Sequence, residues 1–179
     1  MPHERCVEGG FQMKQFKDTD KIKIRNAVNA KVIVRDNELK IYRVFEKKNA
    51  VKYIDYGVLK ELIYNPGFES SLQQGILDIE DMEVKVALGL ESEDVLTDKT
   101  APKNIIVLTE EEKDRMLTKM PIYDFKKKVE MLPREQVREL ANYAIEKEQI
   151  DFSKADVIEK RIGLKVAKAI ELKRANEAD

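Results

Sequence analysis

A histidine and a cysteine near the N-terminus are the residues of this sequence best suited to nucleophilic or metal chemistry. His3 is the only histidine and Cys6 the only cysteine, and both fall within the first ten residues. That stretch lacks the apolar segment of a signal peptide, and we expect residues 1–10 to form a flexible leader. A Cys–His or Ser–His–Asp arrangement needs a histidine that other groups orient, and a zinc site usually needs four ligands. We therefore predict neither a catalytic nucleophile nor a metal site.

Glycine-rich loops and paired carboxylates, which serve phosphate binding and acid–base catalysis, give little support to an enzymatic function. Gly9-Gly10 lies in the expected leader, and Lys99-Thr100 lacks the preceding glycines of a phosphate-binding loop. We interpret the acids between Asp78 and Glu83 as an exposed, helix-capping face, with a carboxylate hydrolase as the enzymatic alternative. We expect the chain not to be an enzyme and to carry no cofactor.

Aromatic and basic residues interleave between positions 35 and 53 and form the best candidate for a binding surface. A basic sheet with exposed aromatic rings can stack on bases and contact the phosphates of single-stranded nucleic acid. Aromatic side chains are also ordinary strand residues that pack into a core or against covering helices, and we favour this second interpretation. The candidate partner or nucleic-acid surface consists of Arg35, Lys40, Tyr42, Arg43, Lys47, Lys48, Lys52 and Tyr53.

The net charge of -1 conceals two segments of opposite sign. Residues 11–60 contain 13 Lys and Arg against 6 Asp and Glu, whereas residues 61–98 contain 10 acids and one lysine. These segments can lie against each other within one chain or meet across neighbouring subunits, and a head-to-tail contact builds rings or open arrays. Charge complementarity of this kind steers docking and register. We therefore expect the partners to be protein subunits of a larger assembly, with a second copy of the chain as one alternative.

Alternating apolar residues indicate that the first half of the chain is built from strands. Side chains point to the same face of a strand at every second position, and Lys21-Ile22-Lys23-Ile24-Arg25 follows this pattern. Asp36-Asn37 is typical of a hairpin turn, because both side chains bond their own backbone and tolerate left-handed conformations. We predict an antiparallel meander or small sandwich with strands at residues 21–25, 31–35, 39–45 and 51–54.

Helical spacing and helix stops dominate the rest of the sequence. Short helices before Asn65-Pro66-Gly67 and before Gly89 are expected to cover the strands. From Thr109, whose spacing to Glu112 is that of a capping box, short connections predict a compact bundle of helices. Within this bundle the sequence predicts a cap at Ser153, a helix stop at Gly163, and one shared face for Ile122, Phe125, Val129 and Leu132.

These elements define an α+β fold, in which an N-terminal antiparallel β meander or small sandwich with covering helices precedes a small C-terminal helical bundle. The predicted units are a leader at residues 1–10, a β-rich domain at 11–96, a linker at 97–108 and the bundle at 109–179. No apolar run approaches the roughly 20 residues of a transmembrane helix, so we expect no contact with a membrane.

Two segments resemble a group of small proteins from tailed-bacteriophage genomes, which are built from a short β module, a linking segment and a helical tail. One is Val58 to Gly67 with the following Gly75 to Ile79, where a helix-turn with Pro-Gly precedes a short apolar strand. The other is Ile162 to Glu171, which contains a Gly-x-x-Val-x-x-Ala-Ile pattern. The resemblance implies a non-enzymatic virion- or capsid-associated protein that binds structural subunits, located in the virion or the host cytoplasm. Nucleic-acid binding or regulation through the basic aromatic sheet is the alternative function.

Overall fold

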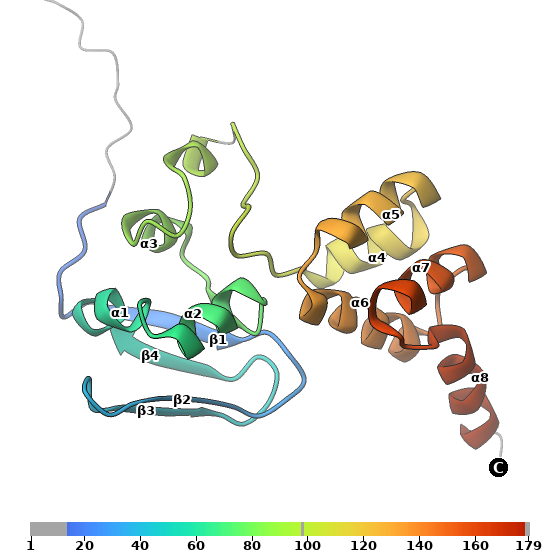
Figure 1. Ribbon diagram of the computed structural model, residues 1–179, viewed down its shortest axis with the longest axis horizontal. Helices are drawn as coiled ribbons and strands as arrows, with labels where there is room; N and C mark the ends of the chain where they lie inside the picture. Colours follow the sequence, from blue (N-terminus) through green and yellow to red (C-terminus); the bar gives the residue numbers. More distant parts are fainter. Residues whose placement is uncertain (1–13, 98, 178–179) are drawn as a thin grey trace, which may run out of the picture.

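The computed structural model describes residues 14–97 and 99–177, and the expected leader with His3 and Cys6 lies outside this part. Five strands in two small antiparallel sheets and eight α-helices confirm the predicted α+β fold with helices at the C-terminus. The β-rich half and the helical half lie side by side (Figure 1).

The strands are β1 (Lys21–Asn26), β2 (Val32–Asp36), β3 (Ile41–Phe45), β4 (Val51–Asp55) and β5 (Leu77–Ile79). In the β-rich half the helices are α1 (Tyr56–Leu62), α2 (Pro66–Gln73) and α3 (Met82–Ala87), followed by the 3-10 helix η1 (Glu93–Thr97). The helical half contains α4 (Glu110–Thr118), α5 (Ile122–Met131), α6 (Arg134–Lys147), α7 (Phe152–Ile162) and α8 (Val166–Glu177).

The strand order differs from that of a simple meander. The central strand β1 pairs with β4 and β5, while β2 and β3 form a separate two-stranded sheet. The side chain of Asn26 stabilises the turn that leads to this strand order. Its oxygen accepts from the Val28 N–H at 3.0 Å, and its amide donates to the Ala30 carbonyl at 2.7 Å. This buried side chain closes a loop that turns the chain away from β1 before β2 begins.

The two sheets share one hydrophobic core with the helices that cover them. As the alternation predicts, Ile22 and Ile24 of β1 point into this core, while Lys21 and Lys23 point outward. The two-stranded sheet faces the same core, so the outer faces of the two sheets point away from each other. The other large contributors are Val34, Ile41, Phe45, Ile54, Leu59, Leu62, Phe68, Leu72, Leu77 and Ile79.

The helical half has its own core, and its helix ends follow the sequence closely. The capping box of Thr109 and Glu112 is present, and Gly163 ends α7 with a left-handed φ of 78°. Two details of the prediction were wrong. Asp151 caps α7 in place of Ser153, because the helix begins earlier and the carboxylate accepts from the Lys154 N–H at 2.9 Å. Ile122, the first residue of α5, is 45% exposed and does not join the buried face.

The two cores meet within the predicted linker. Ile105 belongs to the first core and Leu108 to the second. The carboxylate of Glu91 accepts hydrogen bonds from the backbone N–H groups of residues 103–105, at 2.8 to 3.2 Å. These bonds fix the connection between the halves, and the division into separate domains stays a prediction.

Gly75 and Gly89 offer a matched test of the contact between the halves. Both have a left-handed φ, of 67° and 72°, but a Cβ at Gly75 would lie 2.7 Å from the Ile106 carbonyl oxygen, whereas a Cβ at Gly89 would meet nothing within 4 Å. We expect Gly89→Ala to lower the free energy of unfolding by about 1 kcal/mol and Gly75→Ala by about 3 kcal/mol. Chemical denaturation measures both, and equal losses would contradict the close approach at Gly75.

Candidate protein-interaction surfaces

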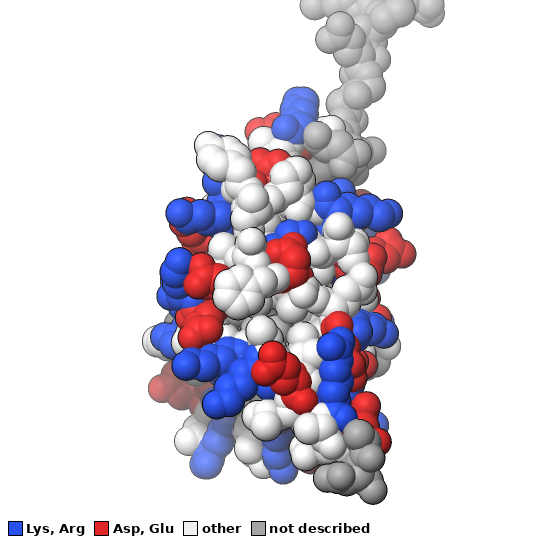
Figure 2. Space-filling model, turned by 90° about the vertical axis from the view of Figure 1, so that its right-hand side faces the viewer, with Lys and Arg blue, Asp and Glu red and all other residues white. Residues whose placement is uncertain are grey.

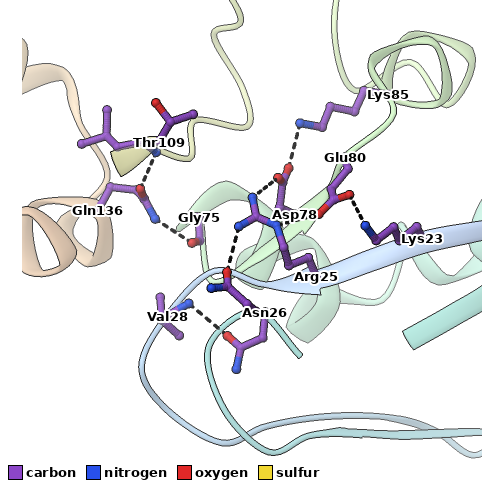
Figure 3. Close-up of polar contacts among 12 residues, drawn as sticks. Lys23, Arg25, Asn26, Val28, Gly75, Asp78, Glu80, Lys85, Thr109 and Gln136 are labelled. Atoms are coloured by element: carbon purple, nitrogen blue, oxygen red, sulfur yellow. Dashed lines mark hydrogen bonds and ion pairs between the residues drawn. The ribbon is translucent and has the colours of Figure 1, made fainter. Parts of the chain in front are cut away.

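The outer face of β1 is neutralised by acids of the same chain. Lys21 pairs with Asp55, and Lys23 lies 2.7 Å from Glu80. Arg25 lies 3.0 Å from Asp78 and 2.8 Å from Glu80 (Figure 3). Lys85 of α3 completes the network with an ion pair of 2.9 Å to Asp78, in which both side chains are buried. Part of the basic segment therefore lies against part of the acidic segment within one chain, and the acids offset the positive charge of β1.

The outer face of the two-stranded sheet is a second surface, which we call the hairpin face and define as Ile33, Arg35, Tyr42 and Val44. In the register of β2 and β3, Ile33 lies opposite Val44 and Arg35 lies opposite Tyr42. Ile33, Arg35 and Tyr42 are exposed, and the Tyr42 side chain is 58% exposed. Apolar, aromatic and guanidinium groups therefore lie next to one another on one face of this sheet, while the opposite face packs into the core.

The other residues of the predicted binding surface do not join the hairpin face. Tyr53 is 55% exposed but lies on the outer face of β4, opposite Lys23. Arg43 is half-buried opposite Val34, and its guanidinium donates to the Tyr42 carbonyl at 3.0 Å. Lys40 and Lys47 are exposed in the turns that flank β3, and Lys52 is exposed on β4. Of the eight predicted residues, the structure places Arg35 and Tyr42 directly opposite one another on a single exposed face.

The eighth residue, Lys48, binds the helical half of the molecule. Its ammonium lies 2.7 Å from the carboxylate of Glu139 on α6, which also accepts from the Asn29 N–H at 3.2 Å. One turn earlier, Gln136 of α6 accepts from the Leu108 N–H and donates to the Gly75 carbonyl, both at 2.8 Å (Figure 3). Gln136 and Glu139 are both buried. Sequence reasoning could not find these pairs, because the partners lie up to 110 positions apart.

Lys113 of α4 lies beside these contacts of Lys48 and Glu139, and within residues 14–97 and 99–177 it forms no ion pair with a carboxylate. Burial and the neighbouring positive charge of Lys48 lower the pKa of Lys113 to about 8, against the opposing attraction of Glu139 and Glu110. The pKa of Lys48 is raised, because the hydrogen bond and charge of Glu139 outweigh the cost of burial. The junction therefore holds two lysines beside one buried carboxylate, and Lys113 is the one that burial destabilises in its charged form.

The helical half exposes a groove between α5 and α7. It has a volume of about 470 Å³, and its apolar lining comes from Ile122, Val129, Phe152 and Val157. Phe152 is 82% exposed, and Tyr123 and Met131 are exposed nearby on α5. Figure 2 shows uncharged surface running along this end of the molecule between basic and acidic side chains. Sequence reasoning missed this groove, because Phe152 stands next to the cap of α7 and so resembles an ordinary helix-start residue.

The described part of the chain offers no cluster suited to metal chemistry. Within residues 14–97 and 99–177, no three His, Cys, Asp or Glu side chains come together in a group that could hold a metal ion. In the same residues no helix has the length and apolar content needed to cross a bilayer. The hairpin face and the α5–α7 groove are the two candidate interaction surfaces.

Lys113 makes stability depend on pH in a predictable direction. Its pKa is 10.5 in the unfolded chain and about 8 when folded, so between these values the unfolded chain binds more protons. The destabilisation is full below pH 8, and the free energy of unfolding rises with pH from there towards 10.5. Lys113→Met should add on the order of 2 kcal/mol at pH 7 and flatten this rise. Denaturant unfolding at pH 7 and pH 9.5 tests this, with the exposed Lys119→Met as control; an unchanged pH dependence in Lys113→Met would contradict it.

Comparison of the whole chain with protein-family models, with curated proteins and with solved structures finds no match.

Proposed function

We propose that the chain is a non-enzymatic bacteriophage protein that binds other structural subunits, in a capsid or head accessory role, in the virion or during assembly in the host cytoplasm. The resemblance of Val58 to Gly67, Gly75 to Ile79 and Ile162 to Glu171 to small phage proteins supports the setting. The observation that carries a binding role is the hairpin face, where Ile33 and Tyr42 remain exposed although both belong to well-formed strands.

The composition of the hairpin face is that of a protein-binding site. Tyrosine and arginine are the side chains that most often dominate the binding energy of protein interfaces, whereas exposed lysines contribute little. Tyr42 and Arg35 lie directly opposite one another, and the buried Val34 and Phe45 hold their strands in place from the other side. A rigid face of this kind loses little conformational entropy on binding. Its partner would supply an apolar surface with an acid positioned for Arg35.

The double variant Ile33→Asp/Tyr42→Ala tests this proposal. Phage particles purified on a density gradient from cells that make the tagged chain should contain the wild-type protein, measured by quantitative mass spectrometry. We expect the double variant to bind about 30-fold less, which corresponds to the loss of about 2 kcal/mol at one hot spot. Tyr53→Ala removes an equally exposed tyrosine from the other sheet and should bind like the wild type. A chain absent from particles, or equal losses in both variants, would sink the proposal.

Nucleic-acid binding is the second candidate, and the adjacent Tyr42 ring and Arg35 guanidinium favour it. A base can stack on the ring while the guanidinium contacts a phosphate. The basic residues of the predicted surface are dispersed, and Lys48 is paired with Glu139. A nucleic acid would therefore contact fewer of these residues than the sequence predicts.

Fluorescence anisotropy with labelled single-stranded DNA and RNA distinguishes this candidate. If it is correct, binding weakens with salt, and Arg35→Gln/Lys40→Gln/Lys47→Gln lowers the slope of log affinity against log salt by about 2. Absence of binding at low salt would eliminate nucleic acid as a partner.

A further inference from the structure

We infer that a second copy of this chain docks on the α5–α7 groove about a two-fold axis, with the two α5 helices antiparallel. This inference goes beyond the proposed function and lies on the other half of the molecule. It is carried by the positions of Lys126 and Glu130 along α5 together with the hollow beside them.

The charges of α5 along the groove are complementary to those of a second α5 that runs in the opposite direction. Lys126 and Glu130 line the groove one helical turn apart, and neither has an ion-pair partner among the described residues. The charged residues that α7 contributes to the groove are engaged within the chain: Lys160 pairs with Asp156 at 2.6 Å, and Arg161 donates to the Leu132 carbonyl at 3.4 Å. A reversed α5 would place each Lys126 against the Glu130 of the other copy and form two equivalent ion pairs. A uniformly acidic or basic partner would satisfy one of these residues and oppose the other.

One side of α5 carries both charges. Ile122, Lys126 and Glu130 recur at every fourth position, so they follow one another along the side of α5 that lines the groove. Met131 lies half a turn away from Ile122 around the helix axis and does not line the groove. The pairing of Lys126 with Glu130 therefore defines the arrangement, and a two-fold axis repeats it as an isologous contact.

The hollow between α5 and α7 can receive an aromatic ring from the second copy. Its volume of about 470 Å³ exceeds the ~150 Å³ that holds a benzene molecule in a protein interior. Ile122, Val129 and Phe152 line this hollow, so apolar side chains would surround a ring that enters it. Covering the exposed Phe152 would add to the apolar area removed from water.

The size of this face makes the dimer weak. Two helices of about 15 Å each offer less than the ~800 Å² per partner of a standard stable interface. Association should therefore fall in the micromolar range or weaker, and the oligomeric state should change with concentration.

Sedimentation velocity from about 5 µM to about 500 µM tests the dimer. We expect the wild-type mass to rise from monomer to dimer over this range and Phe152→Glu to remain a monomer throughout. Tyr64→Glu is the matched control, because Tyr64 is 78% exposed, against 82% for Phe152, but belongs to the β-rich half. It should dimerise like the wild type. A wild-type chain that stays monomeric at every concentration overturns the inference.

Charge reversal tests the antiparallel arrangement. Lys126→Glu and Glu130→Lys should each weaken dimerisation about tenfold, because each replaces two attractions by two repulsions. The double variant Lys126→Glu/Glu130→Lys restores both pairs across the two-fold axis and should recover dimerisation to within about threefold of the wild type. A double variant as weak as its parents would overturn this arrangement. Circular dichroism of each variant checks that these exposed substitutions leave the fold intact.

Discussion

The relative placement of the two halves depends on two buried polar side chains of α6. Gln136 donates to the β-rich half and accepts from the linker, while Glu139 accepts from Asn29 and Lys48 of the β-rich half. A buried amide or carboxylate that loses its partners costs more than the hydrogen bond itself contributes. Gln136 and Glu139 therefore favour the docked arrangement of the two halves, one of which carries the hairpin face and the other the α5–α7 groove.

Electrostatics inside the chain decides which basic residues can reach a partner. Asp78 accepts from Arg25 and Lys85 at once, and Glu80 lies against Arg25 and Lys23, so the most strongly basic strand is already neutralised. Because several ions share these contacts, the network holds β1, β5 and α3 together better than isolated surface pairs would. Whether a basic residue can contribute to recognition depends on its neighbours in the fold as much as on its charge. Arg35 matters because Tyr42 lies opposite it, and Lys48 is occupied by Glu139.

Local patterns carry the parts of this structure that the sequence predicts. The alternation in β1, the capping box at Thr109 and the stop at Gly163 each depend on neighbours within a few residues, and each is found where it was expected. The pairing of β1 with β4 and β5 depends on how a buried Asn26 turns the chain, which periodicity does not encode. The contacts of Gln136 and Glu139 with the β-rich half and the exposure of Phe152 likewise depend on tertiary structure. Each is decided by which elements pack together, and no single segment contains that information.

A two-fold pair built on the helical half gives the hairpin face a further property. Since Gln136 and Glu139 join the halves by hydrogen bonds, each copy would bring one hairpin face to the dimer. Two linked faces bind a repeating surface with an effective concentration that one face lacks, provided their spacing matches that of the repeat. A weak dimer and a modest hairpin face can then produce firm attachment to an array of identical subunits while the free chain stays soluble and separate. Such a division of labour would account for the exposed apolar surface on both halves of one small chain.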